Sequence, residues 1–118
     1  MNHILILGGG ASGMVAAISA AEHTAKDTAV ILLEQNSKLG KKLLATGNGR
    51  CNLDNTTCTV DRYFTSDPQT AAMLLSHIEQ INLQNWFTEH GLLCREAEDG
   101  RLYPYSNQAA DVVNLLIY

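Results

Sequence analysis

Glycines crowd a short stretch near the start of the chain, which reads Gly-Gly-Gly-Ala-Ser-Gly. It fits the spacing G-x-G-x-x-G, with the required glycines at Gly8, Gly10 and Gly13 and with Ala11 and Ser12 between the last two. Glycines at these positions allow a tight turn, a close approach of a pyrophosphate to the backbone, and close packing of a helix on a strand. The N–H groups and the positive dipole end at the helix start favour an anion. The stretch therefore predicts a phosphate-binding turn.

An acid, Glu34, follows Gly13 by 21 residues. In units that bind a dinucleotide on such a turn, a carboxylate at about this distance accepts hydrogen bonds from ribose hydroxyls. Its negative charge opposes a 2′-phosphate on the same ribose. The pattern predicts an adenine dinucleotide and leaves FAD and NAD as alternatives. The competing interpretation is an ordinary glycine-rich turn with Glu34 as a solvated strand end, which the complete context of the motif disfavours.

Two apolar segments and a helix must position these residues. His3–Leu7 precedes the turn without polar alternation, which is typical of a strand buried on both faces, and Thr28–Leu33 leads directly into Glu34. Ala17 stands four residues after Gly13 on the same helical face, so the helix can lie close to the sheet. The predicted fold class is α/β: a Rossmann-like βαβ unit from a partial doubly wound parallel sheet, followed by helices and a small hairpin.

Composition limits the class of protein. The 118 residues are 46% hydrophobic and 17% charged, which predicts one folded domain at most, short for a doubly wound sheet. The formal charge of −4 argues against general binding of nucleic acid or anionic membranes. No apolar run has the length of a membrane span, and the start lacks the pattern of a secretory leader. Three unpaired cysteines predict reduced thiols and a cytoplasmic location.

A second glycine-containing segment lies further along the chain. We expect a short helix from about Leu39, and residues 46–55 then lack an apolar period and are rich in turn formers. Gly47 and Gly49 suggest turns that can aim consecutive N–H groups at an anion, and three nearby cations make the segment locally positive. On composition alone a solvated loop is the simpler interpretation. Cys51 by itself is typical of a small packed side chain.

Residues 40–52 read GKKLLATGNGRCN, which resembles a signature of the bacterial HI0933-like flavoproteins, the YhiN/BaiN or aminoacetone oxidase-like FAD-binding family. Residues 99–104, DGRLYP, followed by Ser106 and by ADVV at 110–113, are similar to a second stretch of that family. The order and spacing match along the whole chain. The resemblance implies that the nucleotide is FAD and that the chain is the N-terminal part, residues 1–118, of a longer flavin-dependent oxidoreductase.

The resemblance also implies a site. The glycine-rich turn would hold the pyrophosphate, Glu34 the adenosine ribose, and the loop at residues 46–52 would lie beside the pyrophosphate and flavin. Lys41 and Arg50 are assigned to charge compensation or to bracing of the loop. The candidate cofactor-binding residues are Gly8, Gly10, Ala11, Ser12, Gly13, Glu34, Gln35, Lys41, Thr46, Gly47, Gly49, Arg50, Cys51 and Asn52. The scattered histidines provide neither a Ser-His-Asp set nor metal-ligand spacing, so no catalytic residue and no metal is predicted.

Helices and a hairpin are predicted in the second half of the chain. Asp67 can cap a helix over residues 68–78, and a second helix is predicted over 83–90 with its aromatic residues in the core rather than on a flavin. Residues 92–103 are typical of a hairpin around Asp-Gly. The segment 109–117 has one apolar helical face and no stop signal, so we expect a truncated domain.

Two alternatives to the FAD-binding segment stay open. An NAD-dependent dehydrogenase half-domain would use the same βαβ unit, because the physics of phosphate binding is identical. A non-enzymatic truncated remnant would bind nucleotide weakly or not at all. In a full-length protein we expect FAD together with NAD(P)H or a small-molecule substrate as partners, and neither nucleic acid nor membrane. The fragment alone is expected to be inactive.

Overall fold

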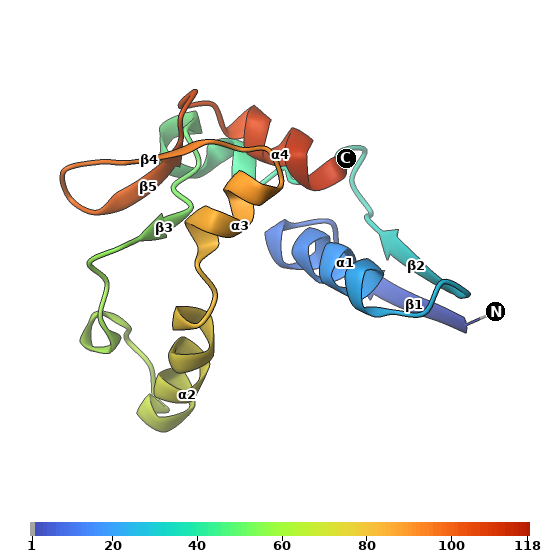
Figure 1. Ribbon diagram of the computed structural model, residues 1–118, viewed down its shortest axis with the longest axis horizontal. Coiled ribbons are helices and arrows are strands. Elements are labelled where there is room, and N and C mark those ends of the chain that lie inside the picture. The colour runs from blue at the N-terminus through green and yellow to red at the C-terminus, as the bar shows by residue number, and fades with distance from the viewer. Residues whose placement is uncertain (1) are drawn as a thin grey trace. The chain divides into compact units, whose positions relative to one another are not determined.

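The structure is a computed structural model that describes residues 2–118 and forms two compact units. Unit 1 contains the chain up to Cys51 together with Asn107–Tyr118, and unit 2 contains Asn52–Ser106. The elements of unit 1 are β1 (Asn2–Leu7), α1 (Ala11–His23), β2 (Thr28–Leu33), the 3-10 helix η1 (Leu43–Gly49) and α4 (Ala109–Ile117) (Figure 1). Those of unit 2 are β3 (Asp54–Asn55), the 3-10 helix η2 (Val60–Arg62), α2 (Pro68–Glu79), α3 (Leu83–Glu89), β4 (Cys94–Glu96) and β5 (Arg101–Pro104).

The first three elements form the predicted βαβ unit. β1 and β2 pair in parallel, with His3 opposite Ala29 and Leu7 opposite Leu33. Parallel strands need a crossover connection, and α1 supplies it while lying along the two strands (Figure 1). The predicted α/β fold class with a parallel strand pair is confirmed.

The prediction that the first strand is buried on both faces is wrong in this chain. Ile4 and Ile6 are half-buried, whereas Leu7 of β1 and its partner Leu33 of β2 are 76% and 49% exposed. Successive side chains of a strand point to opposite faces, and α1 covers only one of them. The other face of the pair, which also carries Leu5, is therefore open to solvent.

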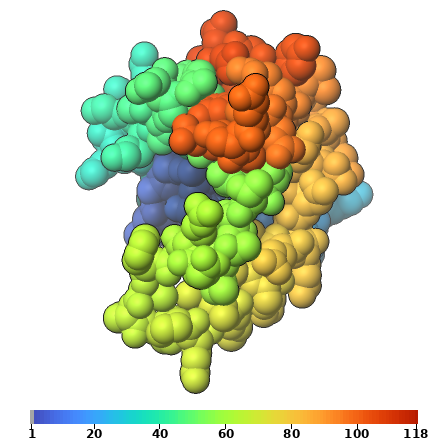
Figure 2. All heavy atoms as spheres, turned by 90° about the vertical axis from the view of Figure 1, so that its left-hand side faces the viewer, coloured from blue at the N-terminus to red at the C-terminus, as the bar shows by residue number. Residues whose placement is uncertain are grey.

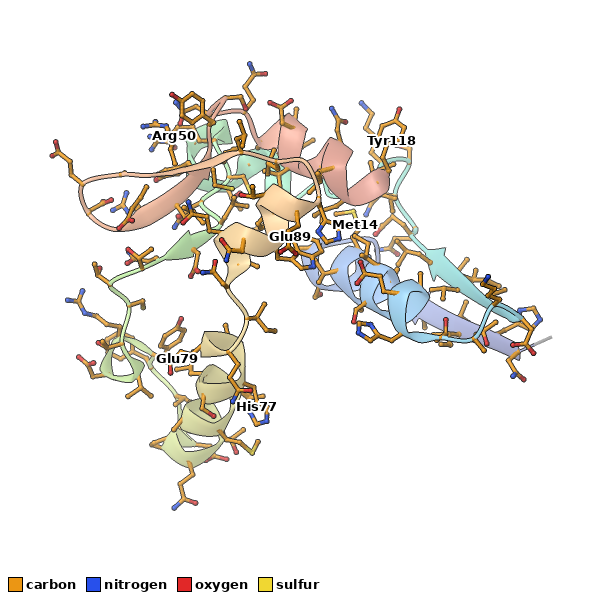
Figure 3. All side chains as sticks on the ribbon, in the orientation of Figure 1. Met14, Arg50, His77, Glu79, Glu89 and Tyr118 are labelled. Carbon is orange, nitrogen blue, oxygen red and sulfur yellow. The ribbon has the colours of Figure 1, made fainter. Side chains whose placement is uncertain are left out.

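The core of unit 1 forms where α4 packs against η1 and α1. The predicted apolar face of α4 is confirmed for its buried members, Ala109, Val112, Val113 and Leu116, whereas Ile117, predicted on the same face, is 50% exposed. Met14 of α1, labelled in Figure 3, is 1% exposed. Gly40 has a positive φ of 65°, and a Cβ there would lie 2.9 Å from Val113 Cγ2 and 3.2 Å from Met14 Cε. Only glycine both adopts this positive φ without strain and leaves room for the side chains of Val113 and Met14.

The predicted short helix near Leu39 is not observed. Residues 35–38 form bends, residues 39–42 form turns, and η1 begins at Leu43. Helical geometry inside η1 is interrupted, because φ is 55° at both Gly47 and Asn48. A helix of L-residues does not continue through left-handed positions, so the glycines and the adjacent asparagine break it.

Unit 2 contains a three-stranded antiparallel sheet in the order β3-β5-β4. The β4–β5 hairpin confirms the prediction, with Cys94 opposite Pro104 and Glu96 opposite Leu102. Its turn includes Gly100, whose φ is 79°. β3 was not predicted, because two residues are too short to show an alternating pattern.

The helices of unit 2 begin at side-chain caps. The Asp67 carboxylate accepts a hydrogen bond from the Thr70 N–H at 3.0 Å, and the Asn82 side chain accepts one from the Asn85 N–H at 2.9 Å. Phe87 of α3 is buried and meets the Trp86 ring edge-on at 5.1 Å. α2 buries none of its residues, and η2 packs beside it (Figure 2).

Candidate nucleotide-binding site

The glycine-rich turn is shaped by its first and last glycines. Gly8 has a φ of 103°, and its N–H donates to the Leu33 carbonyl at 2.7 Å, which joins the turn to the end of β2. A Cβ at Gly13 would lie only 1.8 Å from the Gly8 carbonyl oxygen. Glycine is therefore required at Gly8 by backbone conformation and at Gly13 by close packing.

Gly10 has a different environment. It precedes α1 with an ordinary φ of −79°, and a Cβ built on it would meet nothing within 4 Å. No side chain caps the first N–H groups of α1, which begins with the exposed Ala11 and Ser12. The space beside Gly10 is thus open at the end of the helix where an anion binds best.

Glu34 is held against this turn by hydrogen bonds. Its Oε2 accepts from the Gly9 N–H at 2.6 Å, and its Oε1 accepts from the backbone N–H and side-chain Nδ2 of Asn36 at 2.8 and 2.6 Å. These donors, first the Asn36 N–H and then the Gly9 N–H, lower the pKa of Glu34, with a smaller contribution from Gln35. The carboxylate is therefore ionised and oriented at neutral pH.

A pocket of about 420 Å³ opens between the turn, the end of β2 and the segment before η1. Three ammonium groups and one carboxylate give its lining a net positive charge, which suits a ligand that carries phosphate. The lining residues are Gly9, Gly10, Glu34, Asn36, Lys38, Lys41, Lys42 and Ala45.

Of the predicted site residues, the pocket brings together Gly10, Glu34 and Lys41. Five further lining residues were not predicted: Gly9, Asn36, Lys38, Lys42 and Ala45. Asn36 had a usable signal, because an amide two residues after an acid at a strand end can hydrogen-bond to it. Lys42 had a weak signal as one of the three cations near the second glycine-containing segment, whereas Lys38 had none, since a cation in a turn is usually a solvated side chain.

The predicted loop residues lie in η1 and the turn after it, outside this lining. Thr46 Oγ1 donates to the Leu43 carbonyl at 2.7 Å, and Arg50 Nε donates to the Gly47 carbonyl at 3.1 Å. The Cys51 N–H donates to the Thr46 carbonyl at 3.1 Å, and Cys51 is 1% exposed with a φ of 60°. Gly49, with a φ of 81°, completes this left-handed stretch. The side chains of Thr46 and Arg50 thus brace the loop.

Asn52 belongs to unit 2. With its amide oriented to satisfy both partners, Nδ2 donates to the carbonyl of Asp54 at 2.9 Å and to that of Leu102 at 3.2 Å. These bonds hold the chain before β3 to β5. The side-chain amide of Asn52 therefore stabilises unit 2.

Residues 2–118 contain neither a membrane-spanning helix nor a cluster of metal-ligating side chains. Within that range no helix has the length and apolar character needed to cross a membrane. Nor do three His, Cys, Asp or Glu side chains of the same range gather closely enough to hold a metal ion.

Comparison with known proteins gives a consistent family. Residues 2–118 match the HI0933-like protein Rossmann domain. A 3-dehydro-bile acid delta(4,6)-reductase of Clostridium scindens is 46% identical over 116 residues, which are 98% of this chain and 28% of the relative. Ribosomal RNA dihydrouridine synthases of Escherichia coli and Haemophilus influenzae are each 27% identical, over 96% and 84% of this chain and 27% and 24% of their own lengths.

The chain therefore spans about a quarter of the length of these relatives, between 24% and 28%. The match runs through both units and includes residues 40–52, whose resemblance to the same family is confirmed. The chain belongs to the HI0933-like family, whose Rossmann domain residues 2–118 match.

Proposed function

We propose that this chain is the FAD-binding segment of a flavin-dependent oxidoreductase. The observation that carries the proposal is the 2.6 Å hydrogen bond between the Gly9 N–H and the Glu34 carboxylate. It brings an acceptor for ribose hydroxyls and an uncapped helix start to the same pocket, across 25 residues of sequence. A dinucleotide needs both groups within reach of one another, because its ribose and pyrophosphate are adjacent.

The residues of this pocket fit such a nucleotide. The open space beside Gly10 would admit a phosphate, and Lys41 would offset its charge. A carboxylate has about four acceptor positions, and three hydrogen bonds to Glu34 leave room for a sugar hydroxyl. Its ionised state opposes a 2′-phosphate, which favours FAD or NAD over phosphorylated relatives of NAD.

The choice of a flavin rests on the family. Membership in the HI0933-like family and a reductase among the relatives support an oxidoreductase with a flavin cofactor. When bound, the flavin supplies the redox chemistry, and this chain's residues bind and orient the nucleotide. We assign the pyrophosphate to the start of α1, the ribose to Glu34 and Gln35, and the flavin side to the loop from Thr46 to Asn52. Because the chain spans 28% of the reductase, the substrate would be bound largely by other sequence.

The test is a comparison of FAD with NAD. Titration of FAD into the purified chain should quench flavin fluorescence and raise the melting temperature, ADP should compete, and NAD should bind more weakly. The full-length protein should purify with the visible absorption of a flavin. A colourless full-length protein that binds NADH and not FAD would identify a dehydrogenase half-domain instead. If the isolated chain and the full-length protein are both folded and neither changes the fluorescence of added flavin, the chain is a non-enzymatic remnant.

A further inference from the structure

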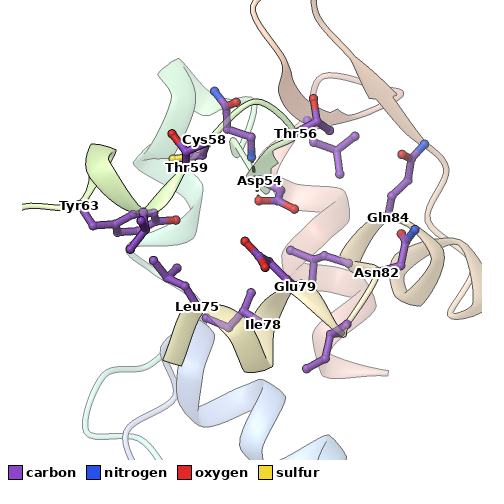
Figure 4. Close-up of a pocket in the computed structure, with 15 residues that line it drawn as sticks. Asp54, Thr56, Cys58, Thr59, Tyr63, Leu75, Ile78, Glu79, Asn82 and Gln84 are labelled. Atoms are coloured by element: carbon purple, nitrogen blue, oxygen red, sulfur yellow. Dashed lines mark hydrogen bonds between the residues drawn. The ribbon is translucent and has the colours of Figure 1, made fainter. Parts of the chain in front are cut away.

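Unit 2 contains a pocket that the proposed nucleotide site does not use. It has a volume of about 410 Å³ and lies between β3, the segment after it, the C-terminal half of α2 and the start of α3 (Figure 4). This volume is typical of pockets that hold a small molecule. Its apolar wall is formed by Val60, Leu75, Ile78, Ile81, Leu83 and Leu102.

The charged side chains of this pocket all have one sign. Asp54 of β3 and Glu79, the last residue of α2, line it, and no lysine, arginine or histidine is among its lining residues. Their carboxylates point toward one another from opposite walls (Figure 4). Among residues 2–118, the Glu79 carboxylate has no hydrogen-bond or ion-pair partner, and Asp54 Oδ1 accepts only the neighbouring Asn55 N–H at 2.7 Å. Two facing carboxylates are stabilised by a cation between them.

An aromatic side chain adds to the attraction for a cation. Tyr63 lines the pocket with its hydroxyl directed inward (Figure 4). A hydrogen bond with the Cys58 side chain, followed by burial and the charge of Asp54, raises the pKa of Tyr63. The phenol therefore stays neutral, and its hydroxyl oxygen, which is directed into the pocket, can face the positive end of a ligand.

These features distinguish between classes of ligand. An anion would be repelled by both carboxylates. A hard metal ion prefers six or more oxygen ligands, and no group of three candidate ligand side chains forms among residues 2–118. An organic cation needs fewer polar contacts and gains from the apolar wall that Leu75 and Ile78 provide.

We propose that this pocket binds a small organic cation of the alkylammonium or quaternary ammonium class. Its charged nitrogen lies between Asp54 and Glu79, and its carbon atoms contact the apolar wall. Both carboxylates remain open to solvent, so the expected dissociation constant is about 1 mM.

The test compares choline with 3,3-dimethylbutan-1-ol, which has the same shape and no charge. In ¹H–¹⁵N NMR titrations of the chain, choline should shift amide signals of residues 54–63 and 75–84 in a saturable way. The neutral alcohol should bind about tenfold more weakly, because it lacks the charge that the carboxylates attract. Equal binding of the two compounds, or no saturable shift up to about 10 mM choline, would overturn the proposal.

Single substitutions test whether the two carboxylates of the pocket attract choline. Glu79→Gln keeps the size of the side chain and should weaken choline binding about threefold, as should Asp54→Asn, because each carboxylate supplies about half of the attraction that the neutral alcohol lacks. Glu98→Gln removes an exposed carboxylate outside the pocket and should leave binding unchanged. Retained amide spectra establish that each variant is folded. If Glu98→Gln weakens binding as much as Glu79→Gln, the attraction is general and the pocket assignment is wrong.

A peptide that carries lysine and arginine serves as the last probe. If it displaces nothing and choline binds, the small-cation proposal is supported. If the peptide alone binds at residues 54–84, the pocket is part of a protein interface and the proposal fails. FAD titration concerns unit 1, so either proposal can fail without the other.

Discussion

At the scale of single residues, Gly10 and Gly13 show two reasons for glycine in one motif. Gly13 is required by the protein itself, because its Cβ would overlap the Gly8 carbonyl. Gly10 meets no protein atom within 4 Å and has an unstrained φ, so its absent side chain leaves space for something outside the chain. The same spacing in the sequence thus combines a folding requirement with a proposed binding requirement.

Substitutions of Gly13 and Gly10 separate the folding requirement from the proposed binding requirement. Gly13→Ala should destabilise unit 1 by more than about 3 kcal/mol, because a backbone contact at 1.8 Å cannot relax by side-chain motion. Gly10→Val should leave the melting temperature within a few degrees of the parent and abolish FAD binding. Chemical denaturation and FAD titration of both variants measure these effects. Gly10→Val protein that still binds FAD with parental affinity would contradict the placement of the pyrophosphate.

Glu34 predicts a pH dependence. Its pKa is lowered in the folded chain, so its hydrogen bonds stabilise the fold above about pH 4.3, the usual value, and this contribution is lost as pH falls through the lowered pKa. Asn36→Ala removes the Nδ2 donor at 2.6 Å and leaves the backbone N–H donors. The pKa of Glu34 should therefore rise toward its usual value. Carboxyl ¹³C NMR titration measures the pKa, with Asn114→Ala as an exposed amide control. An unchanged pKa would contradict the hydrogen bond from Asn36 Nδ2 to Glu34.

At the scale of elements, α4 is the helix that completes the core of unit 1. Its buried face packs against η1 and α1, and Val113 fills the space that Gly40 leaves. The periodicity of its apolar residues was readable in the sequence, because helical faces repeat every three to four residues. Its packing partners were not, because they come from segments that lie 60 or more residues earlier.

The last turn of α4 allows a matched comparison of neighbours. Leu116 is 7% exposed and Ile117 is 50% exposed. Leu116→Ala should lower the free energy of unfolding by about 2–5 kcal/mol, because it leaves a cavity. Ile117→Ala should lower it by about 1 kcal/mol or less. Urea unfolding of both variants measures the difference, and equal losses would show that α4 does not pack by the face described above.

At the scale of the whole molecule, the feature with the largest consequence is the face of the β1–β2 pair that is open to solvent. Leu5, Leu7, Ile31 and Leu33 present apolar side chains to solvent on the face that α1 does not cover. Exposed apolar patches of this kind promote association.

Placing two opposite charges on that face tests how much the face contributes to association. Leu7 and Leu33 are register partners, so Leu7→Lys combined with Leu33→Glu would place opposite charges side by side. The double variant should bind less of a hydrophobic dye and show less concentration-dependent association by light scattering, at little cost in melting temperature. Val15→Lys on α1, also exposed, is the control. If the control suppresses association equally, the loss of any exposed apolar side chain is responsible rather than this face.

The sequence by itself determined the βαβ unit, the hairpin, the Asp67 cap of α2 and the family, because these depend on local spacing and on the conformational needs of glycine and aspartate. Only the tertiary structure decided which residues meet. It joined Glu34 to Gly9, added Asn36 and two lysines to the pocket, assigned Asn52 to a brace in unit 2, and left one strand face bare. The physical reason is that contacts and burial depend on segments distant in the chain, which local patterns do not encode.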